Sequence, residues 1–337
     1  MMTSLYMQGY RMMAKKTAVV RSAFRCGTIA CMTANIIDFE HAKAHSGDHM
    51  VRGTAAYGMV RAFAVSARGI VQAARDNHGT APVVTAALGR LMMGALMMGM
   101  MFKEPDELIT LIVKGDGPIR AMTVTANCEG QVKGFPAEPH VWLPLRADGK
   151  LDVGRAVGKG TLSAVRDLPG TEPYSSRVEL VSGEIAEDLT NYFAISDQVP
   201  TSVGLGVLVG RESNVECAGG FIVQLMPDCI DEVAETIEHN LASMTSVTDV
   251  LKEGALPNDL LERVLDGLGY QELESMPVEF HCGCDEERAA RATMALGAEE
   301  LADMVAKDET AEVFCHFCGR RHYLSPDQLK AMLDSAE

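Results

Sequence analysis

Four cysteines in two close pairs constrain this chain more than any other feature of its sequence. One residue separates Cys282 from Cys284, two separate Cys315 from Cys318, and residues 285–314 lie between the pairs. Four thiolates at this spacing can close a tetrahedral shell around Zn²⁺, because each short pair holds two ligands together before the intervening segment folds back. A module of this size buries little apolar surface, so metal binding would provide much of its folding free energy.

Two other interpretations of the thiols remain open from the residues alone. A site with four cysteines can be a clip that only ties down the C-terminus. Alternatively, Cys315 and Cys318 could be the active-site pair of a thiol-disulfide oxidoreductase, but that motif normally follows a strand and opens a helix. Here Gly319-Arg320-Arg321 follows and predicts a turn. Three neighbouring histidines could each replace a thiolate as a ligand, although a solvated or supporting position is more usual: His281, His316 and His322.

Small zinc modules often bind nucleic acid, but the charge of this one argues against it. Residues 278–337 hold 13 acidic side chains against 6 Lys or Arg, a difference of −7, and the whole chain carries a formal charge of −16. A face that binds phosphates needs the opposite sign. We therefore expect neither nucleic acid nor an anionic membrane as a partner.

Residues 1–49 differ from the rest of the chain. Five Lys or Arg side chains precede the first acid, Asp38, and the stretch Cys26–Ile37 is only weakly apolar, with no clear cleavage site after it. We interpret the segment as a disordered leader or a mis-assigned start rather than a signal peptide. The protein is then cytoplasmic, and in that reducing compartment paired cysteines are more often metal ligands or redox centres than structural disulfides.

Two further features favour a soluble protein with unreactive single thiols. The longest strongly apolar run, Leu91–Phe102, is shorter than the ~20 residues needed to cross a bilayer. The unpaired cysteines are scattered through Ala-, Val- and Gly-rich surroundings, where an inert buried thiol is the usual state. These are Cys26, Cys31, Cys128, Cys217 and Cys229.

From Met50 onward the patterns predict an α+β core without regular βαβ alternation. A hairpin is expected around Gly115-Asp116-Gly117-Pro118. Helices are expected over Gly69–Asn77, after Thr80 as N-cap with Pro82 in the first turn, and over Glu184–Phe193. Strands are expected at Met59–Val65, Leu108–Lys114, Ile119–Asn127, Thr161–Leu168, Arg177–Ser182, Val203–Val209 and Gly220–Met226.

After Pro227 the pattern of apolar residues predicts helices. Apolar residues three or four apart predict one amphipathic helix running from Ile237 to Leu251, and another follows from Pro257 to Leu265. Such a narrow apolar stripe must lie on another surface. We therefore divide the chain into the leader 1–49, a mixed helix/strand core domain 50–230, a helical linker 231–277 docked on the core, and a small C-terminal zinc-binding module 278–337.

Two glycine-rich stretches do not indicate a nucleotide site. Gly154–Thr161 resembles a phosphate loop, but it has three residues instead of four between its glycines, and Gly160 stands where the hydroxyl for magnesium belongs. Gly204–Gly210 has the wrong spacing for a dinucleotide fingerprint and lies within a strand-like run. We interpret the first as a turn and the second as part of a strand.

The spacing of the thiols also permits a redox response. Cysteines two or three positions apart can each form a disulfide with the near neighbour, so an oxidant could turn four thiolates into two local crosslinks and eject the metal. The module would lose the interaction that folded it. The linker would lose its anchor as well, which would expose its apolar stripe and the surface beneath it.

Seven short motifs recur along the chain in the pattern of one known family. They are Cys282-Gly283-Cys284, Cys315-His316-Phe317-Cys318, His78-Gly79-Thr80, Ala87-Leu88-Gly89-Arg90, Lys114-Gly115-Asp116-Gly117-Pro118, Ser196-Asp197-Gln198-Val199-Pro200 and Ala218-Gly219-Gly220-Phe221. On these motifs, the chain from about Met50 to Tyr323 resembles the 33 kDa chaperonin family, heat-shock protein 33, whose four ligand positions are all fulfilled here. Residues 1–49 have no counterpart in that pattern.

The resemblance implies an α+β core, a metastable helical linker and a module that binds one Zn²⁺ in the reduced, inactive form. It implies that oxidants with unfolding stress form the disulfides Cys282–Cys284 and Cys315–Cys318, release zinc and unfold the linker. The active form would be an ATP-independent holdase, often a homodimer, that binds unfolded client proteins and passes them to the seventy-kilodalton heat-shock foldase system. Such a protein is a binder in the stress response and not an enzyme.

The client-binding residues stay unknown from the sequence. Six methionines in Leu91–Phe102 would suit a surface that accepts many apolar shapes, and equally a Met-rich core helix. The alternative function, an oxidoreductase that uses the Cys315/Cys318 pair catalytically, would cycle its disulfide against substrate. A switch would instead consume oxidant once and change shape.

Overall fold

The computed structural model describes residues 10–13 and 47–336 of the 337-residue chain. Most of the predicted leader 1–49 lies outside the described residues. The chain forms two compact units. The larger one ends at Cys282, and the smaller contains the described residues from Gly283 onward together with the strand β1 (Tyr10–Met13), which pairs antiparallel with β13 (Ala311–Cys315).

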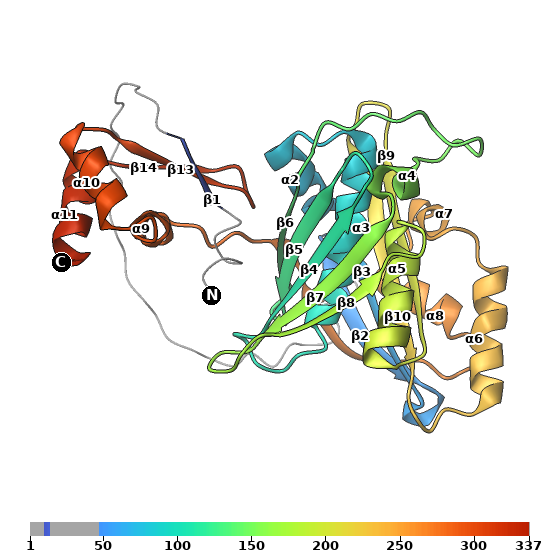
Figure 1. Ribbon diagram of the computed structural model, residues 1–337. Helices are drawn as coiled ribbons and strands as arrows, with labels where there is room; N and C mark the ends of the chain where they lie inside the picture. The colour runs from blue at the N-terminus through green and yellow to red at the C-terminus, as the bar shows by residue number, and fades with distance from the viewer. Residues whose placement is uncertain (1–9, 14–46, 337) are drawn as a thin grey trace. The chain divides into compact units, whose positions relative to one another are not determined.

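The larger unit contains two β-sheets with the helix α3 (Pro82–Gly99) between them, as Figure 1 shows. The five-stranded sheet has the order β11-β2-β3-β10-β9, with β2 His49–Ala55, β3 Val60–Ser66, β9 Thr201–Val209, β10 Val215–Leu225 and β11 Gln271–Pro277. The six-stranded sheet has the order β12-β6-β5-β4-β7-β8, with β4 Leu108–Gly115, β5 Ala121–Asn127, β6 Gln131–Pro136, β7 Gly160–Asp167, β8 Tyr174–Glu179 and β12 Glu279–Phe280.

The central helix α3 contacts both sheets, so apolar side chains are buried on all of its sides. Every residue of α3 except Pro82 and Arg90 is buried, including the methionines within the run from Leu91. Among the described residues, α3 is the one helix that is long and apolar enough to span a membrane. However, 89% of this stretch is buried inside the protein. The structure therefore supports the core interpretation of this Met-rich segment.

The predicted α+β class is confirmed, with local corrections. The helices α2 (Arg68–His78) and α5 (Ile185–Tyr192) lie where the sequence predicted them. The predicted N-cap of α3 is wrong by one residue, because Ala81 is the N-cap. Thr80 instead places its hydroxyl 2.7 Å from that of Thr85. The strands β2 and β6 were not expected.

The prediction of one continuous helix from Ile237 to Leu251 is wrong. The segment forms α6 (Asp231–Ser243) and α7 (Val247–Lys252), and Met244 between them has extended backbone with ψ 135°. Ser246 then opens α7, since its Oγ accepts a hydrogen bond from the amide of Asp249 at 3.3 Å. The linker is also not all helical. After α8 (Pro257–Val264), its last residues form β11, which pairs with β2.

The stretch that resembled a phosphate loop is used structurally. Residues Val153–Val157 form the short helix α4, and the amide of Gly154 donates to Glu184 Oε1 at 3.3 Å. The amide of Lys159 donates to Asp116 Oδ1 at 2.7 Å. The backbone amides that would have to bind a phosphate thus already donate to carboxylates. This supports the interpretation that the stretch is not a nucleotide site.

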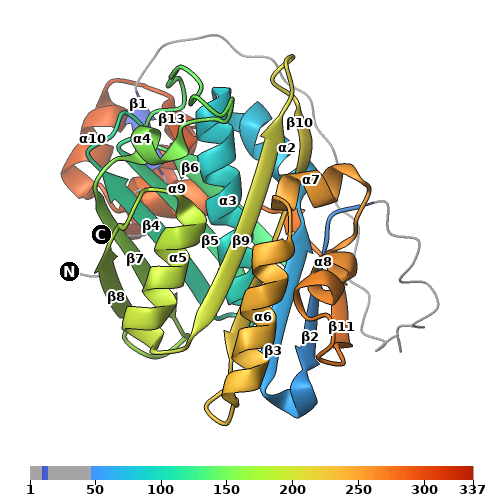
Figure 2. The same ribbon diagram turned by 90° about the vertical axis from the view of Figure 1, so that its right-hand side faces the viewer.

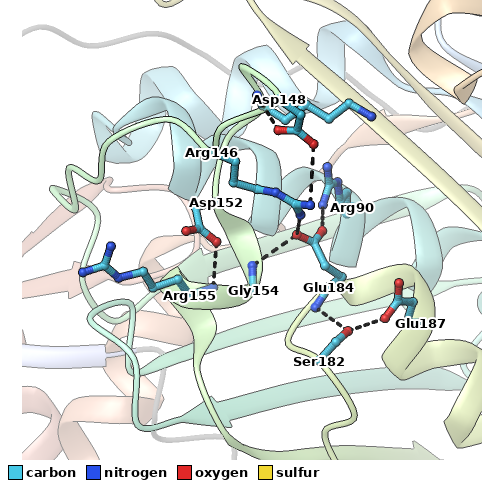
Figure 3. A network of polar contacts seen from close by, with 10 residues as sticks. Arg90, Arg146, Asp148, Asp152, Gly154, Arg155, Ser182, Glu184 and Glu187 are labelled. Carbon is cyan, nitrogen blue, oxygen red and sulfur yellow. Dashed lines mark hydrogen bonds and ion pairs between the residues drawn. The ribbon is translucent and has the colours of Figure 1, made fainter.

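A polar network beside α4 fixes the preceding loop to the core. In Figure 3, Arg90 of α3 and Arg146 of the loop both point at the carboxylate of Glu184. The Arg146 contact spans 3.6 Å. Asp152 accepts from the amide of Arg155 at 3.3 Å and so caps α4. One partly buried acid therefore holds two cations from segments far apart in the sequence.

Candidate metal centre

The second cysteine pair lies on a tight hairpin. β13 ends at Cys315 and pairs antiparallel with β14 (Arg321–Leu324). The amide of Gly319 donates to the carbonyl of Cys315 at 2.8 Å, and the amide of Cys315 donates to the carbonyl of Arg320 at 2.8 Å. Gly319 has φ 72°, a left-handed conformation that glycine adopts without strain. The turn predicted over Gly319-Arg320-Arg321 lies earlier, at residues 316–318, and Arg321 begins β14. This turn brings Cys315 and Cys318 to one end of the hairpin.

The first pair is held between the core and a helix. Just before it, the amide of His281 donates to the carbonyl of Val132 at 2.9 Å, which continues the pairing of β12 with β6. Just after it, Asp285 caps α9 (Glu286–Met294) by accepting from the amide of Arg288 at 2.7 Å. Cys282 and Cys284 therefore lie in a short segment that is held by a hydrogen bond on each side.

The fold brings all four thiols together. The sulfur atoms of Cys282, Cys284, Cys315 and Cys318 lie within 4.8 Å of one another, and Cys284 Sγ is 3.3 Å from Cys318 Sγ. For comparison, the edge of a tetrahedron with Zn–S bonds of about 2.3 Å is about 3.8 Å. Cys284 and Cys315 are buried, at 5% and 1% exposure. These four residues could hold a metal ion, and the all-sulfur donor set fits zinc.

The three neighbouring histidines are outside this cluster. The group within 4.8 Å consists of thiols alone. His281 Nδ1 lies 3.5 Å from Glu279, and the ring of His316 meets that of Phe314 edge to face with centroids 5.3 Å apart. His322 is on β14, with a buried Nε2. Neither of these two contacts involves a cluster thiol, and a supporting position for the histidines stays an expectation.

The smaller unit has a core of its own, but a small one. Its buried apolar residues are Ala289, Leu301, Met304, Ala311, Val313, Leu324 and Leu329. They come from α9, α10 (Ala298–Ala306), the β13/β14 hairpin and α11 (Pro326–Ala336). So few apolar side chains provide little stability, which agrees with a metal centre that contributes folding free energy.

The cysteines expected to be inert lie apart from the cluster. Burial raises the pKa of the Cys128 and Cys217 thiols, which disfavours the reactive thiolate. The pKa of the Cys229 thiol is raised too, by desolvation and by the neighbouring Asp231. Cys26 and Cys31 lie outside the described residues.

A second feature of the larger unit is a sheet face covered by helices of the predicted linker. We call it the covered face, meaning the side of the five-stranded sheet that carries Val51, Ala55, Val60, Ala62, Ala64, Phe221 and Val223. Helices α6, α7 and α8 lie over it in Figure 2. Their residues Val250, Leu260, Leu261 and Val264 have no exposed surface. The periodic apolar stripe predicted the burial of these helices, but not which surface they cover.

Four hydrogen bonds stabilise this cover. Asn240 of α6 donates to the carbonyls of Val264 and Asp266 at 3.1 and 3.0 Å. Tyr270 donates its hydroxyl hydrogen to Asn258 Oδ1 at 2.7 Å, and Asn258 in turn donates to Glu272. Burial raises the pKa of Tyr270, so the hydroxyl stays protonated as a donor.

The fold and the site together define a protein with an α+β core, a helical cover over one apolar sheet face, and a terminal module beside four thiols that could hold a metal ion. The chain belongs to the Hsp33 family, whose model matches residues 48–325.

Named relatives agree with this assignment. The chain is 45% identical to the 33 kDa chaperonin of Agathobacter rectalis over 85% of this chain and 99% of that one. It is 43% identical to the 33 kDa chaperonin of Bacillus subtilis over 85% and 98% of the two chains. The crystal structure of the 33 kDa chaperonin of Thermotoga maritima matches with a TM-score of 0.79 at 38% identity, covering 86% of this chain and 99% of that one. The protein is thus a chaperone, a class that binds unfolded clients.

Proposed function

We propose that this protein is a redox-regulated, ATP-independent holdase. In the reduced form the four thiolates hold one Zn²⁺, the module is folded, and the linker covers the apolar sheet face. In the oxidised form the cover is released and the face binds unfolding proteins. The observation that carries the proposal is the cluster of four thiols within 4.8 Å, in a chain whose preceding segment covers an apolar surface.

The covered face suits this role because of what it would expose. The face consists of Val, Ala and Phe side chains that are buried under α6, α7 and α8. A contiguous apolar surface of this kind is rare on a free monomer and is typical of a binding site. The last covering helix, α8, ends at Val264, and the strand β11 leads from it to Pro277, five positions before Cys282, so the state of the thiols would reach the cover through this one strand.

The oxidation step balances with a peroxide as the oxidant. Two thiolates give up two electrons and form one S–S bond, and hydrogen peroxide takes up these two electrons and two protons from water and is reduced to two molecules of water. Two such steps would form Cys282–Cys284 and Cys315–Cys318. A disulfide sulfur carries no thiolate charge, so the residues would no longer hold the metal, and the module would lose its folding free energy.

The remaining assignments follow from this activity. A holdase of this kind acts in the oxidative stress response, in the cytoplasm, as a homodimer once activated. It then passes its clients to the seventy-kilodalton heat-shock foldase system. It would bind neither nucleic acid nor a membrane, and it would not be an enzyme. The alternative, a thiol-disulfide oxidoreductase, is less well supported, since Cys315 ends a strand in a hairpin instead of opening a helix.

The test compares reduced and oxidised protein in one assay. Zinc-loaded reduced protein and protein treated with peroxide at raised temperature are each mixed with a chemically denatured client without ATP, and aggregation is followed by light scattering. A chromogenic chelator measures the zinc released. We expect suppression only after oxidation, with about one zinc released per chain. Zinc that stays bound, or leaves with no gain in client binding, would refute the proposal.

A matched pair of variants sharpens this test. Cys318→Ser removes one thiol of the cluster, whereas Cys229→Ser removes a thiol far along the chain from it. We expect Cys318→Ser to lose the requirement for oxidant, and Cys229→Ser to respond like the wild type. Catalytic turnover of a small disulfide by the wild type would favour the oxidoreductase alternative.

A further inference from the structure

Helix α7 packs on the sheet over two glycines, and we call this contact the seat of α7. Gly206 of β9 and Gly219 of β10 lie directly opposite each other in the antiparallel register. A Cβ atom on Gly219 would lie 2.9 Å from Leu251 Cδ1, on α7. Because neither glycine has a side chain, α7 approaches the strand backbones more closely than any other residue would allow.

Gly206 is the more specific of the two. A Cβ added there would lie 2.8 Å from Thr248 Cγ2, 3.1 Å from Thr248 N and 3.2 Å from Val247 Cβ. All three nearest atoms belong to α7. By contrast, the nearest atom to a Cβ on Gly219 is the carbonyl oxygen of Val65, on the neighbouring strand at 2.7 Å. A methyl group at Gly206 therefore conflicts with the cover while the sheet keeps its pairing.

Helix α7 depends on this seat. It has six residues, from Val247 to Lys252, and a helix so short is not stable by itself in water. Its main local support is the Ser246 cap. Val250 is fully buried against the covered face and Val247 is 8% exposed, so docking supplies most of what keeps α7 helical.

A thiol under the same helix can report on it. Cys217 of β10 lies with its Sγ 3.8 Å from the carbonyl oxygen of Thr248. Burial raises the pKa of this thiol, which slows its alkylation while α7 is in place. When α7 lifts, Cys217 loses this shield.

We propose that Gly206 sets the threshold for opening of the cover, because only a residue without a side chain lets α7 dock closely enough to keep the reduced form inactive. This inference rests on the proposed holdase function. It adds the residue of the sheet whose contact with α7 keeps the reduced form inactive. A methyl group at Gly206 would then activate the protein with zinc still bound and all four cluster thiols reduced.

The experiment uses the full-length, zinc-loaded, reduced Gly206→Ala protein. Iodoacetamide alkylation of Cys217 is followed by peptide mass spectrometry, and client aggregation is followed by light scattering without oxidant. We expect Cys217 to be alkylated at least about tenfold faster than in the wild type, since overpacking of a close contact shifts the opening equilibrium by that order. We also expect aggregation to be suppressed without oxidant, with an unchanged zinc content.

Three further variants separate the seat from general damage. Gly47→Ala adds a methyl group where no atom lies within 4 Å, and it should behave as the wild type. Adding Thr248→Ser to Gly206→Ala removes the closest atom, Cγ2, and keeps the hydroxyl that lies 3.0 Å from Ser246 Oγ. This double variant should bring the rate for Cys217 back toward the wild type. Thr248→Ile places a larger side chain at the same contact, but on the helix. It should therefore release α7 while the sequence of the sheet is unchanged.

The outcomes distinguish the two proposals. If the oxidised wild type holds clients but reduced Gly206→Ala and Thr248→Ile remain inactive, with Cys217 alkylated at the wild-type rate, the inference about Gly206 is wrong and the holdase function stands. If the oxidised wild type never holds clients, the proposed function fails. The Cys217 rates would still show whether Gly206 seats α7.

Discussion

The sulfur atoms of Cys284 and Cys318 lie 3.3 Å apart, although the two residues belong to different pairs. The folded module therefore brings the pairs together across 33 intervening residues, numbered 285–317. Such convergence is what a four-thiolate metal site requires, whereas the proposed disulfides form within each pair. The folded and oxidised arrangements of the same four residues are thus different.

Disulfide mapping of the oxidised protein should find Cys282–Cys284 and Cys315–Cys318 as the main products. Once the metal is lost the module unfolds, and contact between the pairs is lost with it, while one or two intervening residues still hold each local pair together. Tryptic digestion under non-reducing conditions and mass spectrometry measure the linkages. A dominant Cys284–Cys318 bond would show instead that oxidation occurs in the folded module.

Replacing one thiol should remove the metal and unfold the smaller unit. We expect Cys318→Ser to lower zinc affinity by at least about two orders of magnitude, because a neutral hydroxyl replaces a thiolate ligand. Metal content per chain and protease resistance of residues 283–336 measure the effect. The core signal in circular dichroism should remain, and its loss would contradict an independent core.

Weakening the cover should lower the oxidant dose needed for activation. Leu260 of α8 is fully buried on the covered face, so Leu260→Ala should destabilise docking by about 2–4 kcal/mol. Leu256, at the start of α8, is 41% exposed and Leu256→Ala serves as the control. Limited proteolysis of the linker and light scattering at graded peroxide measure the change. Equal responses of the two variants would contradict a role for docking.

The pH dependence of stability should carry a signature of Asp188. Burial raises the pKa of this carboxyl above its ordinary 3.8, although the amides of Ser182 and Val181 donate to it. Because the folded pKa is the higher one, the contribution of Asp188 to stability is full below pH 3.8 and is lost as pH rises through the folded pKa.

We therefore expect Asp188→Asn to be at least as stable as the wild type at pH 7, and its relative advantage to shrink as pH falls toward 4. Urea unfolding curves followed by circular dichroism at several pH values measure this difference. Glu238→Gln, on the exposed side of α6, is the control and should show no such trend. A relative advantage that grows on acidification would contradict the sign of the shift.

Several elements were predictable because their signals are local. The hairpin of β4 and β5 was expected from glycine-rich turn residues between two alternating runs, and helices were expected at the positions of α2 and α5. The break in the linker at Met244 was missed, because apolar spacing continues through it and only the extended backbone there ends α6. β11 was missed because its residues are mostly exposed and its strand form depends on pairing with β2.

The sequence by itself determined the chemistry of this protein. Its four thiols, their two short spacings and its motifs were sufficient to indicate a metal site and the family, since ligand type and local spacing are properties of the chain alone. Only the tertiary structure decided that the thiols converge within 4.8 Å, that the methionines of α3 are core, and that α7 rests on Gly206. These are contacts between residues distant in the sequence, and packing and sheet register decide them together.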